Sequence, residues 1–458
     1  MNPTSSLVCA GCGTTVPPDA PYPFRCPNAD SDDVDHVLQR RLDLRETRFP
    51  GGDEPNPFLR YRELLHSYRF GRLHGLADEQ LRAVIERLDA RVAVVDGHGF
   101  QVTPFTRSAA LSDELGFSQD GGVWIKDETG GVAGSHKARH LFGVLLQLEV
   151  NEQARVTDPL KRPELAIASC GNAALAAAVV AAAGRWVLHV FVPEDAEPSV
   201  MERLASLGAR ITVCERPAGS VGDPTVVRLR QAIADGALPF TCQGDLNGLA
   251  IEGGHTLGWE LAAAGVALDR VVVQVGGGAL ASAVAGGLSE ALRLGAIGHR
   301  PRVDTVQTES AWPLKRAYDR VCEHPGGLTY ARAHRRSFMW PWETEPHSIA
   351  HGILDDETYD WAAVIEAMLS TGGRPVVVDE DLLEQANALA RGSTDVPVDP
   401  TGSSGLAGLL ELRTQGVVGD DERVAVLFTG LDRSTDIYAR RRSHEEFSGT
   451  RHPVAQGI

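Results

Sequence analysis

Short β-branched runs that alternate with alanine- and leucine-rich stretches are the feature that most limits how this chain can fold. Three such runs, each followed by a helical stretch, lie at residues 166–168, 187–192 and 271–275. This alternation is typical of βαβ units, in which helices cover both faces of a parallel sheet. The sequence therefore predicts an α/β fold whose ligands bind in the loops that follow the strands.

The first 55 residues differ in composition from the rest of the chain. Pro, Asp and Gly are frequent there, and residues 50–55 read Pro-Gly-Gly-Asp-Glu-Pro, which is typical of a linker. Beyond them residues 78–94 have apolar side chains at helical spacing. We therefore predict a small appendage at residues 1–55 and a catalytic domain at residues 56–458.

The charge balance excludes some partners. The 458 residues include 61 acidic and 44 basic side chains, and the net charge of −17 repels nucleic-acid phosphates and anionic lipids. The longest wholly apolar run, residues 173–183, is too short to span a bilayer, and the start lacks the pattern of a secretory signal. We expect a cytoplasmic protein that binds neither nucleic acid nor membrane.

A glycine-rich segment at residues 126–139 carries Lys137 into the first turn of a predicted helix, residues 138–148. The positive end of a helix dipole disfavours the ammonium form of such a lysine. A neutral lysine amine can bond covalently to a carbonyl group. The motif therefore predicts a reactive lysine, with an ordinary surface lysine as the alternative.

Two further loops that join a strand to a helix consist of small residues. The first contains Ser169, Cys170 and Gly171, followed by Asn172. Its helix amides are open to an anion such as a substrate carboxylate, and the asparagine can hydrogen-bond a ring hydroxyl. The second contains Gly276, Gly277, Gly278, Ala279 and Leu280. It suits a phosphate at a helix N-terminus, although it matches neither the dinucleotide fingerprint nor the P-loop. A plain helix cap is the alternative for either loop alone.

The order and spacing of these loops resemble the fold-type II pyridoxal-phosphate enzymes, the tryptophan synthase β superfamily, over roughly residues 58–431. That superfamily includes threonine synthase and serine or threonine dehydratase. The resemblance implies a two-lobed α/β fold with parallel sheets flanked by helices, in which the smaller lobe spans roughly residues 138–250. It also implies that pyridoxal 5′-phosphate is held by Lys137, with Asn172 at its 3-hydroxyl and residues 276–280 at its phosphate.

Thr429 follows the apolar run at residues 424–428, where family members place a hydroxyl beside the pyridine nitrogen. A neutral hydroxyl does not stabilise a protonated ring, and this favours elimination over transamination. The alternative is a buried strand end followed by a turn.

The substrate is less closely defined by the sequence. The N-terminal cysteines resemble those of many threonine synthases, but Ala138 stands where those enzymes have Asp. Ala250 takes the place of the arginine that grips a substrate phosphate, and Asp245 repels such a dianion. We therefore expect a homodimeric lyase that converts a small hydroxy amino acid into a keto acid and ammonia by β-elimination. Threonine synthase, a β-replacement enzyme and a non-catalytic regulatory protein that binds the cofactor are the alternatives.

Cys9, Cys12 and Cys26 have the spacing of three ligands of a zinc ribbon. The expected fourth position is Ala29, which cannot bind a metal. The residues that can take its place are His36, Asp30 and Asp32. A bound zinc ion and a metal-free knuckle are both compatible with this pattern.

Overall fold

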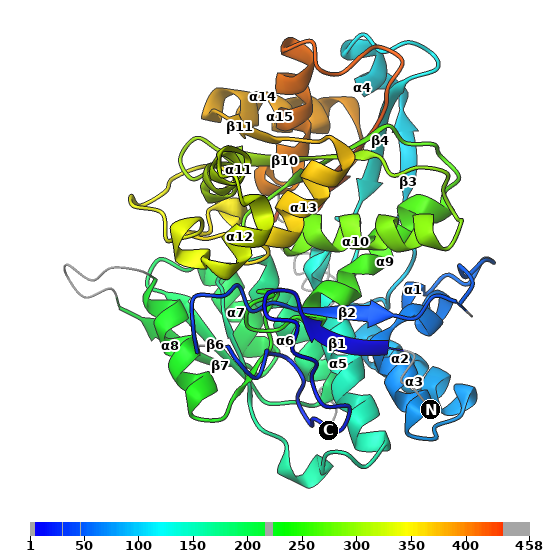
Figure 1. The fold of residues 1–458 in the computed structure, drawn as a ribbon, viewed down its shortest axis with the longest axis vertical. Helices are drawn as coiled ribbons and strands as arrows, with labels where there is room; N and C mark the ends of the chain where they lie inside the picture. The colour runs from blue at the N-terminus through cyan, green and yellow to red at the C-terminus, as the bar shows by residue number, and fades with distance from the viewer. Residues whose placement is uncertain (1–4, 30, 46, 216–222, 434–458) are drawn as a thin grey trace, which may run out of the picture.

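The computed structural model describes residues 5–29, 31–45, 47–215 and 223–433, and Figure 1 shows their arrangement. The larger of its sheets has six strands in the order β11-β10-β9-β12-β4-β3. These strands are β3 (Phe105–Ser108), β4 (Gly122–Asp127), β9 (Arg270–Gln274), β10 (Arg302–Thr308), β11 (Pro375–Val378) and β12 (Arg423–Phe428). All pair in parallel except β3, which runs antiparallel to β4. The carboxyl ends of the five parallel strands therefore meet at one edge of the sheet.

A second parallel sheet has the order β7-β6-β5-β8 and forms the centre of a separate lobe (Figure 1). Its strands are β5 (Leu165–Ala168), β6 (Leu188–Pro193), β7 (Arg210–Cys214) and β8 (Leu238–Pro239). The helices α6 (Asn172–Gly184), α7 (Pro198–Ser206) and α8 (Pro224–Ala234) connect them. The predicted α/β fold with parallel sheets flanked by helices is confirmed, and the three predicted runs became β5, β6 and β9.

Helices cover both faces of the larger sheet because successive strand residues point to opposite sides. Val271 and Val273 belong to one buried cluster and Val272 to another. The first cluster includes α10 (Ala279–Arg293), α11 (Pro313–Glu323), α12 (Gly327–Ala333) and α13 (Trp361–Thr371). The second includes α4 (Ala109–Glu114), α14 (Glu380–Ser393) and α15 (Pro400–Thr414). The residues that connect these strands to the helices therefore form loops at the edge of the sheet.

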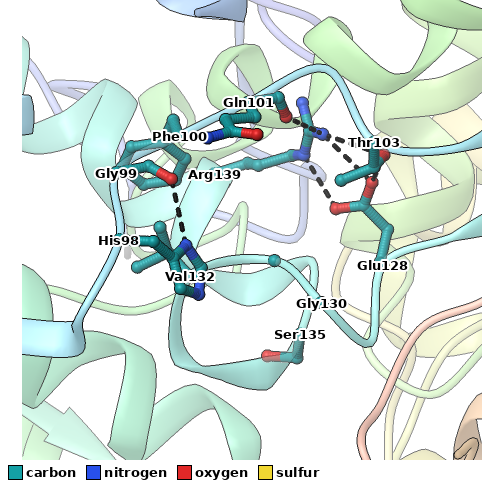
Figure 2. A pocket seen from close by; sticks show the side chains of 11 residues that line it. His98, Gly99, Phe100, Gln101, Thr103, Glu128, Gly130, Val132, Ser135 and Arg139 are labelled. Carbon is teal, nitrogen blue, oxygen red and sulfur yellow. Dashed lines mark hydrogen bonds and ion pairs between the residues drawn. The ribbon is translucent and has the colours of Figure 1, made fainter. Parts of the chain in front are cut away.

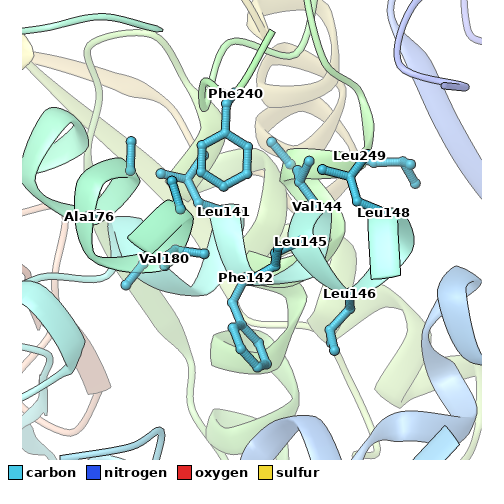
Figure 3. Packing of buried hydrophobic residues seen from close by; sticks show 14 of the residues in the cluster. Leu141, Phe142, Val144, Leu145, Leu146, Leu148, Ala176, Val180, Phe240 and Leu249 are labelled. Atoms are coloured by element: carbon cyan, nitrogen blue, oxygen red, sulfur yellow. The ribbon is translucent and has the colours of Figure 1, made fainter. Parts of the chain in front are cut away.

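The helix that carries Lys137 is buried on all sides. This helix, α5 (Lys137–Gln153), packs with α6 and with α9 (Leu249–Ala263), and Figure 3 shows Leu141, Phe142 and Leu145 directed to different neighbours. A Cβ atom added at Gly143 would lie 2.9 Å from the Cα atom of Gly253, so α5 and α9 are in close backbone contact. Such packing fixes the first turn of α5, and with it the position of the lysine.

The N-terminal segment forms an antiparallel pair, β1 (Ser5–Cys9) and β2 (Leu38–Leu42), followed by α1 (Pro57–Arg60), α2 (His66–Leu73) and α3 (Asp78–Asp96). Helix α3 confirms the amphipathic helix predicted there. Strand β2 contacts α9, and the buried Arg40 lies 2.8 Å from Glu252 and 2.6 Å from Glu290. The cysteine-containing appendage therefore lies against the core, while its boundary at residue 55 stays a prediction. Among the described residues, no helix combines the length and apolarity needed to cross a membrane.

Candidate active site

Three loops converge at the carboxyl edge of the larger sheet. The lysine loop follows β4, Thr429 follows β12, and the glycine loop at residues 276–280 follows β9; β12 lies between the other two strands. Ser135 forms an antiparallel bridge with Gly430, and the Leu431 amide donates to the Gly134 carbonyl at 2.9 Å. The lysine loop and the strand end with Thr429 are therefore joined directly.

Lys137 is the first residue of α5 and is half-buried. Within the part of the chain that the structure describes, its amine has no hydrogen bond or ion pair to another residue. Two residues further on, the buried Arg139 side chain bonds Glu128 at 2.8 Å and Glu260 at 2.5 Å. This arginine anchors the lysine loop while the amine of Lys137 stays unengaged.

A cavity of about 190 Å³ lies beside this anchor, and Figure 2 shows Arg139 bonded to Glu128 on one side of it. Gly130 and Ser135 of the lysine loop line the cavity, but Lys137 does not. Burial opposes ionisation of Glu260, yet Arg139 and Lys126 hold the pKa of its carboxyl below the ordinary value. The cavity therefore lies next to the ion pairs of Arg139 that anchor the lysine loop.

Asn172 is the first residue of α6, at the N-terminus that faces the lysine loop. A Cβ atom added at Gly430 would lie 2.9 Å from Asn172 Nδ2, so the asparagine lies against the strand end that holds Thr429. The guanidinium of Arg433 donates to Asn172 Oδ1 and, at 2.7 Å, to the Ala133 carbonyl. One arginine therefore ties the asparagine to the lysine loop.

The predicted carboxylate loop lies in the smaller lobe, between β5 and α6. Ser169, Cys170 and Gly171 are all half-buried, and the Gly171 amide donates to Ser169 Oγ at 3.4 Å. The first turn of α6 follows at once, and the first amides of a helix have no partner within the helix. The position suits an anion at a helix N-terminus, as predicted.

The glycine loop is in close contact with a segment that the sequence did not indicate, residues 353–360. A Cβ atom at Gly276 would lie 2.2 Å from Asp355 Oδ2, and Gly278 has a φ of 93° that favours glycine. The Thr358 hydroxyl donates to the Gly276 carbonyl at 2.9 Å, and the Asp360 amide donates to the Gly277 carbonyl at 3.0 Å. This cover segment, residues 353–360, leaves no room for side chains at residues 276–278.

The cover segment brings carboxylates to the predicted phosphate site. The Gly277 amide donates to the carboxylate of Asp355, and burial raises the pKa of that carboxyl to about 6, although the charge of Lys137 opposes the shift. Burial also raises the pKa of Asp360 well above its ordinary value, and the neighbouring Asp245 and Asp35 act in the same direction. Burial therefore opposes ionisation of both carboxyls, which lie on the side of the site that would face a phosphate.

Thr429 is buried and its hydroxyl accepts a hydrogen bond from Gln274 Nε2 at 2.7 Å. The same amide nitrogen donates to the Gly402 carbonyl at 2.9 Å, which fixes its orientation. Because the threonine oxygen is an acceptor in this bond, its own O–H is left to donate to a ligand. The group at the predicted ring-nitrogen position is therefore a neutral donor.

The predicted metal ligands also meet. The ligand atoms of Cys9, Cys12, Cys26 and His36 all lie within 4.8 Å of one another. Asp32 bonds the histidine, at 2.9 Å from its Nε2 atom. Asp30 lies outside the described residues.

Several site residues were missed in the sequence. Gln274 had a signal, because it is the one polar residue in the apolar run at residues 271–275. Asp355 had none, since its segment reaches the glycine loop from about 80 residues away along the chain. Arg433 had no signal either, and only the fold brings it to Asn172.

Known proteins are similar to this chain. A family model described as pyridoxal-phosphate dependent enzyme matches residues 98–430, more than half of the chain. Threonine synthase from Methanocaldococcus jannaschii is 25% identical over 351 residues, which cover 75% of this chain and 77% of the relative. Threonine synthase from Methanosarcina acetivorans is 25% identical over 334 residues, 72% of this chain and 74% of the relative.

Two solved structures share the fold at lower identity. Maize serine racemase has a TM-score of 0.58 and 19% identity, covering 80% of this chain and 97% of the racemase. Threonine deaminase isoform 2 from Solanum lycopersicum has a TM-score of 0.57 and 17% identity, covering 82% of this chain and 96% of the deaminase. The resemblance inferred from the sequence is confirmed: the chain belongs to the family of pyridoxal-phosphate dependent enzymes, with the fold of type II.

Proposed function

We propose that the chain is a lyase that removes the β-hydroxyl group of a small hydroxy amino acid, giving a keto acid and ammonia. The observation that carries the proposal is the neutral Gln274–Thr429 pair, whose hydroxyl is left to donate to a ring nitrogen. A carboxylate at that position would stabilise a protonated ring and favour transamination, whereas a neutral donor favours return of the electrons to a leaving group.

The residues at the site fit pyridoxal phosphate. Lys137 offers an unengaged amine, Asn172 an amide for a ring hydroxyl, and residues 276–280 the amides of a helix N-terminus for a phosphate. The glycines at residues 276–278, where a side chain would not fit, support a close approach of the backbone to that phosphate. One contact works against binding, because the Asp355 carboxylate uses the Gly277 amide.

In this proposal Lys137 would hold the cofactor, and its amine would act as the general base that removes the α-proton of the substrate. The bound cofactor supplies an electron sink for the charge that develops at the α-carbon. The amides at the start of α6, next to Ser169, Cys170 and Gly171, bind the substrate carboxylate. A helix N-terminus orients the carboxylate and so fixes which bond of the α-carbon faces the lysine.

The residues before and at the start of α9 favour a neutral substrate side chain over a phosphorylated one. The half-buried Asp245 offers a carboxyl group there rather than a cation. Ala250, at the start of α9, is fully buried and offers no charge to a second phosphate. The 25% identity to threonine synthases keeps O-phosphohomoserine as the second candidate substrate.

The test incubates the purified chain with serine, threonine and O-phosphohomoserine, and measures keto acid against inorganic phosphate. Keto acid from serine or threonine supports the proposal; phosphate release with formation of threonine would replace β-elimination by threonine synthesis. Borohydride reduction followed by peptide mapping is expected to place the pyridoxyl group on Lys137. Lys137→Ala is expected to lose the visible band and turnover, while the matched variant Lys161→Ala, at an exposed lysine, keeps both.

We also propose that the chain forms a homodimer in the cytoplasm. Gel filtration with light scattering tests whether it is a dimer.

A further inference from the structure

Three cysteines and a histidine of the N-terminal segment are arranged like the ligands of a tetrahedral metal ion. Cys9 Sγ lies 3.5 Å from His36 Nδ1, and Cys12 Sγ lies 3.6 Å from Cys26 Sγ. With zinc–sulfur bonds of about 2.3 Å and a zinc–nitrogen bond of about 2.0 Å, tetrahedral geometry puts such ligand atoms about 3.5 to 3.8 Å apart. These two distances match that geometry, and all four ligand atoms lie within 4.8 Å of one another.

Backbone and amide donors point at the sulfur atoms. The Cys12 amide donates to Cys9 Sγ at 3.5 Å, and the Asn28 amide donates to Cys26 Sγ at 3.4 Å. The side-chain amide of Asn28 adds a donor to Cys12 Sγ at 3.6 Å. Hydrogen bonds of this kind stabilise thiolates, which are the form in which cysteine binds a metal. All three cysteines are free of disulfide bonds.

The histidine is oriented by a carboxylate. His36 is buried, and its Nε2 atom lies 2.9 Å from Asp32 Oδ1. If Nε2 carries the proton and donates it to Asp32, Nδ1 is left with a lone pair that faces Cys9. A carboxylate behind a ligating histidine is the usual partner that fixes the tautomer and ring orientation at zinc sites.

We propose that Cys9, Cys12, Cys26 and His36 bind one structural Zn²⁺ ion. Three thiolates and an imidazole in a tetrahedron match zinc better than the oxygen-seeking cations. Four protein ligands leave no open position for a substrate, so the ion has a structural role. The site rests on the ligand geometry alone and does not depend on the proposed reaction.

The metal-binding segment is tied to the cover segment of the glycine loop. Asp35, next to His36, accepts a hydrogen bond from Trp361 Nε1 at 3.0 Å, and its amide donates to the Arg332 carbonyl at 2.7 Å. Trp361 begins α13 and directly follows Asp360, whose amide bonds Gly277. Zinc thus fixes a segment that supports the predicted phosphate site, a consequence that rests on the proposed cofactor site.

The experiment measures zinc in the full chain, purified with reductant and without chelators. We expect one zinc ion per chain, loss of zinc in Cys12→Ser, and retention in His36→Cys, which supplies a fourth thiolate. Cys322→Ser, at an exposed cysteine outside the cluster, is the matched control. Asp32→Asn keeps all four ligands and is expected to weaken zinc binding by about 10- to 100-fold.

Two results overturn the site: reduced wild-type chain that takes up no zinc when zinc is supplied, or Cys12→Ser that binds zinc as tightly as the wild type. Circular dichroism of each variant separates loss of the ligand from loss of the fold. Binding of pyridoxamine phosphate to zinc-loaded and zinc-free chain then tests the link to the glycine loop. An unchanged dissociation constant refutes that link and leaves the metal site standing.

Discussion

Asp355 is expected to weaken cofactor binding as the pH rises, because its carboxylate occupies the Gly277 amide that a phosphate needs. A phosphate dianion and an ionised carboxylate do not share one amide, so the binding-competent form of the chain is the one with neutral Asp355. Burial raises the pKa of this carboxyl to about 6, which makes the neutral form a minority at neutral pH.

The magnitude follows from the neutral fraction. With a pKa of about 6, the neutral form is about one half at pH 6 and about one thirtieth at pH 7.5. Asp355→Asn removes the charge and keeps the shape, so the ratio of the wild-type to the variant dissociation constant is expected to be about 2 at pH 6 and about 30 at pH 7.5. The second ratio corresponds to about 2 kcal/mol.

The assay is fluorescence titration with pyridoxamine phosphate, whose amine cannot bond to Lys137. Titration of the ligand's own phosphate cancels in the ratio, because it affects both proteins equally. Glu384→Gln, which removes an exposed carboxylate from α14, is the control for net charge and is expected to give a ratio near 1. A ratio for Asp355→Asn that stays near 1 across this pH range refutes the reasoning. It would mean that the cover segment moves away from the glycine loop without protonation of Asp355.

Three further substitutions test the interactions that hold the site. Arg139→Met leaves the carboxylate of Glu128 buried without its cation and is expected to lower the free energy of unfolding by about 3 to 5 kcal/mol in urea. Burial opposes ionisation of Glu290, but Arg40 lowers its pKa to about 2, so it stabilises the fold above pH 4.5 and this contribution is lost as the pH falls towards 2. Glu290→Gln is expected to remove about 2 kcal/mol of that pH dependence between pH 5 and pH 3, measured from urea unfolding curves. Gln274→Leu takes the donor from Thr429 and is expected to cost about 1 to 3 kcal/mol of unfolding free energy, unless a water molecule replaces the amide.

The parts of the fold that local pattern determines were predictable. Strands β5, β6 and β9 are runs of apolar residues followed by helices, and α3 has apolar side chains at helical spacing. Lys137, Asn172 and Thr429 were found because each stands at a strand-to-helix or strand-end junction, where the α/β fold places ligand sites. Their roles remain predictions that the proposed experiments test.

The residues that the sequence did not reveal act through contacts between distant segments. Arg433 reaches Asn172 across 261 positions, and Asp355 reaches the glycine loop from a segment with no motif of its own. Such contacts depend on how the lobes and the sheet edge come together, which no local periodicity encodes. The same limit applied to His36, one of three candidates in the sequence until the fold placed its Nδ1 atom beside Cys9.

The cover segment offers one physical reason why the appendage and the catalytic core belong to one chain. Its first part presents Asp355 to the glycine loop, and its last residue, Asp360, bonds that loop immediately before Trp361 donates to Asp35. Because these contacts hold the cover segment in place, the segment cannot move away from the glycine loop as a whole. Protonation of the Asp355 carboxylate is therefore the less costly way to admit a phosphate. If removal of zinc frees the end of the cover segment that Asp35 holds through Trp361, the pH dependence of cofactor binding is expected to weaken as the zinc content falls. Movement of the segment would then be an alternative to protonation of Asp355.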